Sequence, residues 1–258
     1  MISVATIHNA EDFAGMRKAG QLAAETLDMI AEYVKPGVTT ESLDKRCFEF
    51  ADKNNACIAP LFYKGFPKSV CTSINHVICH GIPSSRVLEE GDIVNIDVTV
   101  IVDGWHGDTS RMYKVGKINN KAQKLIDCTY EAMMLGINEI APNKKTGDIG
   151  NAIQTYSEAR SYSVVQDFCG HGLGRVFHSF PNILHYGTPN TGEDLIQGMF
   201  FTVEPMINTG KYDVRLLKDG WTAVTKDKSL SAQFEHTCGV TESGFEIFTK
   251  SPAGLDKP

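Results

Sequence analysis

The stretch GDIVNIDVTVIVDGWHGDTS, residues 91–110, decides the fold. Its residues alternate along a strand, which places one polar face opposite an apolar face formed by Val94, Ile96, Val98 and Val100. Asp103-Gly104 predicts a two-residue hairpin turn of a primed type, because glycine tolerates the positive φ that such a turn needs. Position 97 then lies opposite position 110, and Asp108 becomes the diagonal neighbour of Asp97, roughly 7–8 Å away between backbones.

The hairpin therefore predicts two carboxylates on one side of a sheet. Like charges placed so close repel each other unless something positive lies between them. One interpretation is a binding site for cations at Asp97 and Asp108. The alternative is a solvated hairpin face with two surface acids, and this stretch alone does not decide between them.

Composition limits the classes of protein that need to be considered. The chain has 258 residues, 42% of them hydrophobic, and a net charge of −6, which suits a globular domain and opposes bulk binding of nucleic acid. The first residues lack the basic segment and apolar core of a signal peptide, and no run of residues has transmembrane length. We expect a cytoplasmic protein that binds neither membrane nor DNA.

The cysteines do not indicate a disulfide framework. Their number, seven, is odd, and no C-x-x-C pair occurs, which also argues against a zinc site made of thiolates. We expect most of them to be small buried hydrophobic residues.

Four segments show apolar residues at helical spacing: 12–34, 40–51, 121–140 and 146–160. They occur as two pairs with similar layouts. An offset of 106 superimposes Pro36 on Pro142 and Thr40, an expected N-cap, on Thr146. An offset of 107 superimposes Gly91 on Gly198 and Asp97 on Glu204.

This order of matches predicts an internal duplication. The expected fold is α+β, with two helix-helix-sheet halves related by a pseudo-two-fold axis around a central, mostly antiparallel sheet flanked by helices. Because no long linker separates the halves, we expect a single domain over residues 1–250 and a short, loose C-terminal tail at 251–258.

The second half contributes three more candidates for a polar site. Glu204 and Glu235 each stand alone in an apolar, strand-like run, and His171 lies between glycines in CGHGLG. Each has a simpler interpretation, an exposed acid or a turn histidine. The duplication favours the functional interpretation of Glu204, because this residue occupies the place of Asp97.

Together these residues predict a dinuclear metal centre. Four buried carboxylates without compensation would cost many kcal/mol, and two divalent cations cancel their charge. Carboxylates with a single imidazole favour Mn(II), Fe(II), Co(II) or Zn(II) over Cu(I) or thiolate zinc. Two such ions about 3.5–4 Å apart activate water and polarise the bond that it attacks, which is hydrolytic chemistry.

At these residues the sequence resembles the type I methionine aminopeptidases of bacterial type, members of peptidase family M24 with the pita-bread (creatinase/aminopeptidase) fold. The resemblance extends over about residues 10–249. The matching motifs are KSVCTSINHVICHGIP, GDIVNIDVTV, DGWHGDTSRM, CGHGLGRVFH, ILHYG, FTVEPM, DGWTAVTKD and SAQFEHT.

The resemblance implies a role for each matching residue. The five metal ligands would be Asp97, Asp108, His171, Glu204 and Glu235. Glu204 would also carry a proton to the leaving amine, His80 would lie near the scissile amide nitrogen, and His178 would stabilise the carbonyl oxygen. The substrate pocket would be formed by these two histidines with Tyr63, Phe66, Cys71, Phe177 and Trp221. Phe66 stands where other members have tyrosine, so the pocket can differ in shape.

The implied activity is metal-dependent removal of the initiator methionine from nascent chains whose second residue is small. The implied enzyme is a monomer with two divalent ions, and it works near the ribosome exit tunnel. Lysines 211, 218, 226 and 228 are candidates for contacts with ribosomal RNA, although a solvated loop is the simpler interpretation. The competing functions are a prolidase or aminopeptidase P, an inactive binding module of the same fold, and a structural protein stabilised by metal.

Overall fold

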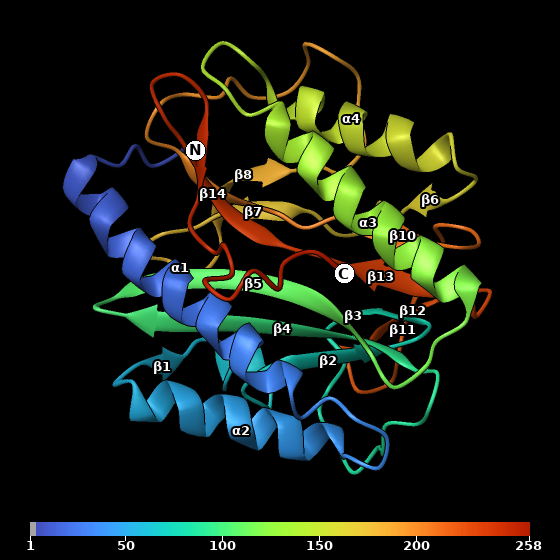
Figure 1. Cartoon of the computed structure of the whole chain (residues 1–258). Helices are drawn as coiled ribbons and strands as arrows, with labels where there is room; N and C mark the ends of the chain where they lie inside the picture. The colour runs from blue at the N-terminus through green and yellow to red at the C-terminus, as the bar shows by residue number, and fades with distance from the viewer. Residues whose placement is uncertain (1–3) are drawn as a thin grey trace.

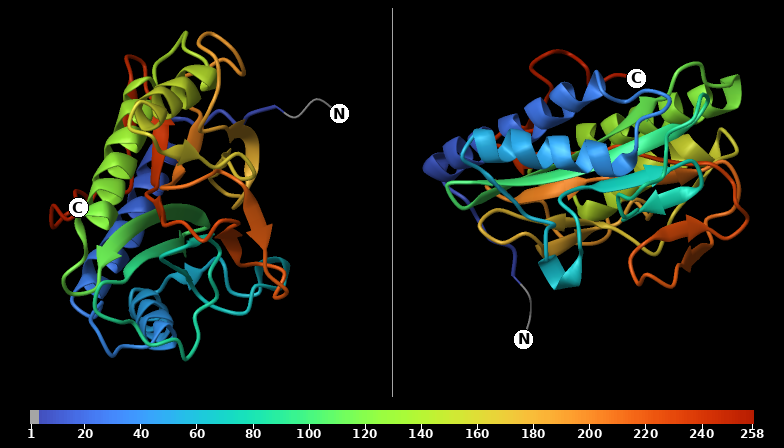
Figure 2. Two further views of the ribbon diagram at one scale, coloured as in Figure 1. Left: turned by 90° about the vertical axis from the view of Figure 1, so that its right-hand side faces the viewer. Right: turned by 90° about the horizontal axis from the view of Figure 1, so that it is seen from below.

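The computed structural model describes residues 4–258. Four α-helices lie on one face of the strands, and loops and short strands lie on the opposite face (Figures 1 and 2). Their bounds are α1 Ala10–Ala31, α2 Thr40–Lys53, α3 Asn120–Asn138 and α4 Thr146–Glu158. None of the helices in the described chain combines the length and the hydropathy needed to cross a membrane.

The predicted hairpin is the longest pair of strands. Strands β4 (Ile93–Val102) and β5 (Trp105–Lys114) pair antiparallel, with Asp97 opposite Ser110 and Thr99 opposite Asp108. Asp103 and Gly104 form the turn between them, with φ of 50° and 81°. Both positive angles match a primed two-residue turn, so the predicted register and turn are confirmed. Strands β1 (Cys57–Ile58) and β2 (Cys71–Ile74) pair with the other edge of β4, β2 opposite Val94–Asp97 and β1 opposite Val100 and Ile101.

Three further sheets belong mainly to the second half of the chain. The largest has the order β15-β14-β9-β7-β8. An antiparallel bridge between Ser110 and Glu235 connects the first hairpin to the segment that leads into β14. The strands are β3 Val77–Cys79, β6 Ser163–Val164, β7 Gly170–Gly172, β8 Ser179–Ile183, β9 Phe200–Val203, β10 Met206–Asn208, β11 Val214–Leu216, β12 Ala223–Thr225, β13 Ser231–Gln233, β14 His236–Val240 and β15 Phe245–Ile247.

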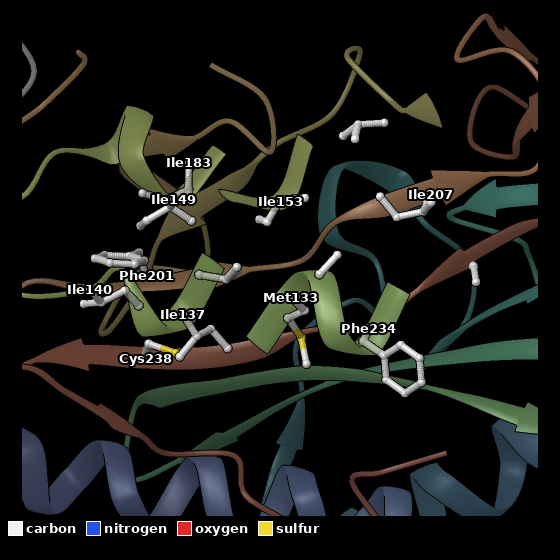
Figure 3. Packing of buried hydrophobic residues seen from close by; sticks show 14 of the residues in the cluster. Met133, Ile137, Ile140, Ile149, Ile153, Ile183, Phe201, Ile207, Phe234 and Cys238 are labelled. Carbon is white, nitrogen blue, oxygen red and sulfur yellow. The ribbon is translucent and has the colours of Figure 1, made fainter. Parts of the chain in front are cut away.

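Each helix pair covers its own hydrophobic core. The apolar face of β4 packs under α1 and α2, where Val94, Ile96, Val98 and Val100 are fully buried. In the other half, Ile137 of α3, Ile153 of α4 and Phe201 of β9 belong to one buried hydrophobic cluster (Figure 3). Burial of such side chains contributes about 1.5–3 kcal/mol each to folding. The two cores hold the strands so that their polar faces point away from the helices.

The duplication is visible in the backbone hydrogen bonds. The amide of Thr40 donates to Arg86 O at 3.0 Å, and the amide of Thr146 donates to Glu193 O at 2.9 Å. The amides of Gly91 and Gly198 donate in the same way, to Val115 O and Val240 O, each at 2.9 Å. The two glycines also share a left-handed conformation, with φ of 93° and 91°. The donor residues of these pairs keep the offsets of 106 and 107 found in the sequence, so the halves repeat in structure as well.

Two local details differ from the sequence-based expectation. The N-cap of α2 is Thr39, whose hydroxyl accepts the Ser42 amide, and Thr40 is the first helical residue. Thr40 uses its own hydroxyl to bind the Ser84 backbone instead. The tail at 251–258 is anchored rather than loose. Its Ser251 hydroxyl donates to Asp28 of α1 at 2.7 Å, and its Asp256 lies 3.5 Å from a guanidinium nitrogen of Arg111.

Candidate metal centre and substrate cavity

The candidate metal ligands come from both halves of the chain. Asp97 lies on β4 and Asp108 on β5, whereas His171 lies on β7. Glu204 directly follows β9, and Glu235 lies between β13 and β14. All five side chains line one cavity of about 310 Å³ on the face of the sheet that the helices leave open.

Three of the five candidate ligands are close enough to hold one ion. Suitable donor atoms of Asp108, His171 and Glu235 lie within 4.8 Å of one another, and all three residues are buried. The imidazole Nε2 of His171 is 3.5 Å from Asp108 Oδ2 and 3.7 Å from Glu204 Oε1. A carboxylate of the first half, Asp108, and one of the second half, Glu204, thus lie beside the same imidazole nitrogen of His171.

Hydroxyl groups orient two of the carboxylates. Thr99 Oγ1 donates to Asp108 Oδ1 at 2.7 Å, and Thr202 Oγ1 donates to Glu204 Oε1 at 2.7 Å. The backbone amide of Glu204 donates to Nε2 of the buried His185 at 3.1 Å. Such supporting contacts fix the direction in which ligand oxygens point.

The electrostatics of the cavity fit a divalent cation. Burial, together with the charges of the neighbouring carboxylates, raises the pKa of Asp97 and of Glu235 well above the ordinary range. Burial likewise raises the pKa of Glu204 to about 7. For His171, burial works against protonation, but Asp108 and Glu204 raise its pKa to about 9. These groups repel one another and hold protons when nothing else neutralises them, so a cation relieves the repulsion.

The remaining predicted residues line the same cavity. Tyr63 stacks on His178 with ring centroids 5.1 Å apart, and Phe177 lies 4.1 Å from His178. His178 in turn lies 4.2 Å from the ring of His171. Burial, and then the charge of His171, lowers the pKa of His178 to about 4, so its ring is neutral at pH 7 and offers one N–H donor.

The other side of the cavity is largely apolar. Phe66 is 3% exposed and meets Trp221 edge-on at 5.2 Å, and His80 lies 6.2 Å from the same indole ring. Cys71, which lies opposite Asp97 in the pairing of β2 with β4, also lines the cavity and is buried as a free thiol. An apolar chamber thus opens beside a cluster of ionisable groups, which is the usual composition of a site for a small substrate.

Several cavity residues were not predicted. Thr99 and Gln233 share strand faces with Asp97 and Glu235, so the period-two pattern alone could have indicated them. Residues 167–169 belong to an irregular loop after β6, where no pattern in the sequence points toward the cavity. The unpredicted lining residues are Pro60, Lys64, Cys79, Thr99, Asp167, Phe168, Cys169, Met206 and Gln233.

Comparison with known proteins places this site in a class. Residues 14–242 match the family model described as metallopeptidase family M24. The chain belongs to this family, and the use of divalent metal follows from the family together with the ligand cluster. The fold class predicted from the sequence, α+β of the pita-bread type, is confirmed by the solved structures that the chain resembles.

Within the family, the chain is most like methionine aminopeptidases among the relatives compared. It is 64% identical over 253 residues to the one from Rickettsia prowazekii, an alignment that covers 98% of each chain. It is 52% identical over 246 residues to that of Escherichia coli K12, covering 95% of this chain and 93% of the relative. The resemblance predicted from the motifs is therefore confirmed.

Solved structures give the same result. The Rickettsia prowazekii methionine aminopeptidase superposes with a TM-score of 0.95, over 95% of this chain and 100% of the other. The Thermotoga maritima methionine aminopeptidase, 36% identical, has a TM-score of 0.93 over 95% and 99% of the two chains. The Pyrococcus furiosus prolidase, 21% identical, shares only the fold, with a TM-score of 0.76 over 65% of its own length.

Proposed function

We propose that this chain is a methionine aminopeptidase that removes the initiator methionine from nascent polypeptides whose second residue is small. One observation carries the proposal: four carboxylates and an imidazole converge at one end of a cavity whose other wall is apolar. The near full-length identity to methionine aminopeptidases supports the same substrate. Prolidases match the fold at low identity and over part of their length, so the comparisons favour them less.

We further propose two divalent ions, held by Asp97, Asp108, His171, Glu204 and Glu235. The number of charges supports two, because four carboxylates balance two dications. When bound, the ions would supply an activated water and polarise the scissile carbonyl. Mn(II), Fe(II), Co(II) and Zn(II) all suit these ligands, and metal availability commonly decides among them.

The residues around the ions complete the proposed mechanism. His178, neutral and beside His171, would donate its N–H to the carbonyl oxygen as negative charge develops there. Glu204 would carry a proton toward the leaving amine, and His80 would bind the scissile amide nitrogen. The methionine side chain would lie among Tyr63, Phe66, Cys71, Phe177 and Trp221, whose polarisable atoms suit a thioether.

The decisive experiment uses two peptides and metal-stripped protein. Met-Ala-Ser and Met-Leu-Ser are incubated with protein reconstituted with each of the four metals, and the products are identified by mass spectrometry. We expect metal-dependent loss of one methionine from Met-Ala-Ser only. Glu235→Gln should abolish it, whereas Glu49→Gln on the exposed face of α2 should not. Folded, metal-bound protein that cleaves neither peptide would instead favour a binding module.

The metal content of the active protein tests the dinuclear proposal separately. Two ions per chain are expected at full activity, and full activity with a single ion would contradict the second site. A cytoplasmic location, a monomeric state and docking near the ribosomal exit tunnel also stay predictions. The four candidate lysines are exposed around β11 and β12, where contact with RNA phosphates is sterically open.

A further inference from the structure

The mouth of the cavity carries a turn with unusual backbone angles. Phe62 and Lys64 have φ of 65° and 48°, in the left-handed region, and Gly65 follows with φ of 88°. For residues other than glycine this conformation costs roughly 1–2 kcal/mol, and it is rare for a bulky side chain. Backbone hydrogen bonds hold it in place, including Phe62 N to Phe66 O at 2.8 Å. Residues kept in such conformations are often found at functional sites.

This turn, the 3-10 segment Tyr63–Gly65, projects from the face opposite the helices (Figure 2). The hairpin of β11 and β12 projects from the same face (Figure 2). Tyr63 of the turn and Trp221 of the loop between β11 and β12 both line the cavity. The turn and the hairpin therefore flank the way out of the cavity.

Lys64 is at the outer end of a chain of contacts that begins at the metal centre. His171 contacts His178, and the His178 ring stacks on Tyr63 with centroids 5.1 Å apart. The Lys64 ammonium lies 5.2 Å from the centroid of the Tyr63 ring. Lys64 is exposed and also lines the cavity, so it stands at the mouth.

Few other charges face the cavity. Apart from the candidate ligands and the histidines, Lys64 and Asp167 are the charged residues that line it in the part of the chain described. Asp167 is exposed and lies on the loop after β6, whereas Lys64 lies on the turn beside His178. The side of the mouth next to His178 is thus marked by one fixed positive charge.

We propose that Lys64 is a specificity-determining residue, which favours an acidic side chain at the third or fourth position of the substrate. The inference rests on the proposed function. The proposed site encloses the first residue and confines the small second one, so the substrate from the third residue onward leaves through the mouth. His178 lies at the proposed scissile carbonyl. The contacts of 5.1 and 5.2 Å place the Lys64 ammonium at most about three residues of extended chain away, at roughly 3.3–3.6 Å each. The exposed ring of Phe62, next to Lys64, would cover the apolar part of the same segment.

The test measures kcat/KM for Met-Ala-Xaa-Ser-Gly and Met-Ala-Ser-Xaa-Gly, where Xaa is Asp, Gln or Lys. For the natural protein at low salt, we expect kcat/KM at one of the two positions to be highest for Asp, lower for Gln and lowest for Lys. Each replacement should lower kcat/KM about three-fold, as for a partly screened charge pair. The difference should lie in KM, because Lys64 contacts no reacting atom. It should shrink in 0.5 M NaCl.

Two variants decide the result. Lys64→Gln should make the three peptides equivalent, and Lys64→Glu should reverse the order. Lys121→Glu, an equal charge change on exposed α3, is the matched control and should keep the natural order. Methionine release with an order that Lys64→Glu leaves unchanged would overturn this inference alone. No release from any peptide would overturn the proposed function, and this inference with it.

Discussion

At the scale of single residues, the hydroxyl groups behind the carboxylates determine how well the site is prepared for metal. Thr202 Oγ1 reaches Glu204 Oε1 at 2.7 Å, and the valine side chain has the same shape without the donor. We expect Thr202→Val to weaken Mn(II) binding about 10-fold, because loss of an orienting contact typically costs 10- to 100-fold in metal affinity. Isothermal titration calorimetry measures this directly.

Thr26→Val provides the control for that substitution. Thr26 is as buried as Thr202, but its hydroxyl donates to Leu22 O inside α1. This helix belongs to the layer on the other face of the sheet, and it contains none of the candidate ligands. Its replacement should lower stability without changing the affinity for Mn(II). Equal Mn(II) affinities for the natural protein and Thr202→Val would show that Glu204 needs no orienting hydroxyl.

A second residue-scale prediction concerns His236. Burial, and then the charges of Arg111 and Lys250, lower its pKa to about 3, whereas an unfolded histidine titrates near 6.5. Between about pH 3 and pH 6.5, the folded state therefore binds fewer protons at His236 than the unfolded state does. The stability that neutral His236 provides is complete above about pH 6.5, and it is lost as the pH falls toward 3.

The variant His236→Asn should isolate this contribution. Its deficit in unfolding free energy relative to the natural protein should be constant above about pH 7 and shrink by about 1.4 kcal/mol per pH unit below 6.5. Urea unfolding of metal-free protein from pH 8 to pH 5 measures it. A deficit that does not vary with pH would mean that His236 titrates normally in the fold.

At the scale of elements, the packing of α1 on β5 depends on the absence of a side chain at Gly107. A Cβ there would lie 2.3 Å from the backbone C and O of Ala19, and backbone atoms cannot move aside cheaply. We expect Gly107→Ala to destabilise the protein by about 3 kcal/mol, the upper part of the usual range for overpacking. Gly244→Ala, which meets no atom within 4 Å, should have little effect. Thermal unfolding of both variants tests the contact, and similar melting temperatures would contradict it.

The features that could be predicted from sequence are those with local causes. Alternation along 91–110 and the Asp103-Gly104 turn together determine the register of the hairpin, and with it the pairing of Asp97 with Ser110. The repeat of helix starts at Thr40 and Thr146 follows from equivalent backbone contacts in the two halves. The duplication and the need to balance four carboxylates grouped the five candidate ligands, but the histidines and aromatic residues of the pocket could be added only through the family resemblance.

Features with distant causes were missed. The tail is held because Arg111 of β5, which is buried and lies 2.8 Å from Asp28 of α1, also lies near Asp256. Three distant segments thus share one partly buried charge cluster. Nothing in the composition of 251–258 indicates such partners. The left-handed angle of Lys64 is equally unreadable from sequence, because lysine has no intrinsic preference for that conformation.

At the scale of the whole molecule, the proposed metal ligands come from both halves of the chain. Asp97 and Asp108 come from the first, whereas His171, Glu204 and Glu235 come from the second. Two ions held by these residues would link the two sheets across the bridge between Ser110 and Glu235. Because the unfolded chain has no such site, metal binding should stabilise the fold by about 2.7 kcal/mol at a free concentration 100 times its Kd.

The variant Glu235→Gln distinguishes stabilisation by bound metal from ordinary packing. It should raise the unfolding free energy of the metal-free protein and lower that of the metal-bound protein. In metal-free protein it removes a buried carboxylate whose pKa is raised by burial and by Asp108, so we expect unfolding free energy to rise by about 1 kcal/mol at pH 7.5. With Mn(II) present the natural protein should become the more stable one, since the variant lacks a ligand. Urea titrations with chelator and with Mn(II) measure both differences. If Glu235→Gln were destabilised without metal and still gained the full stabilisation from Mn(II), Glu235 would be a packing residue and the two halves would not be joined through it.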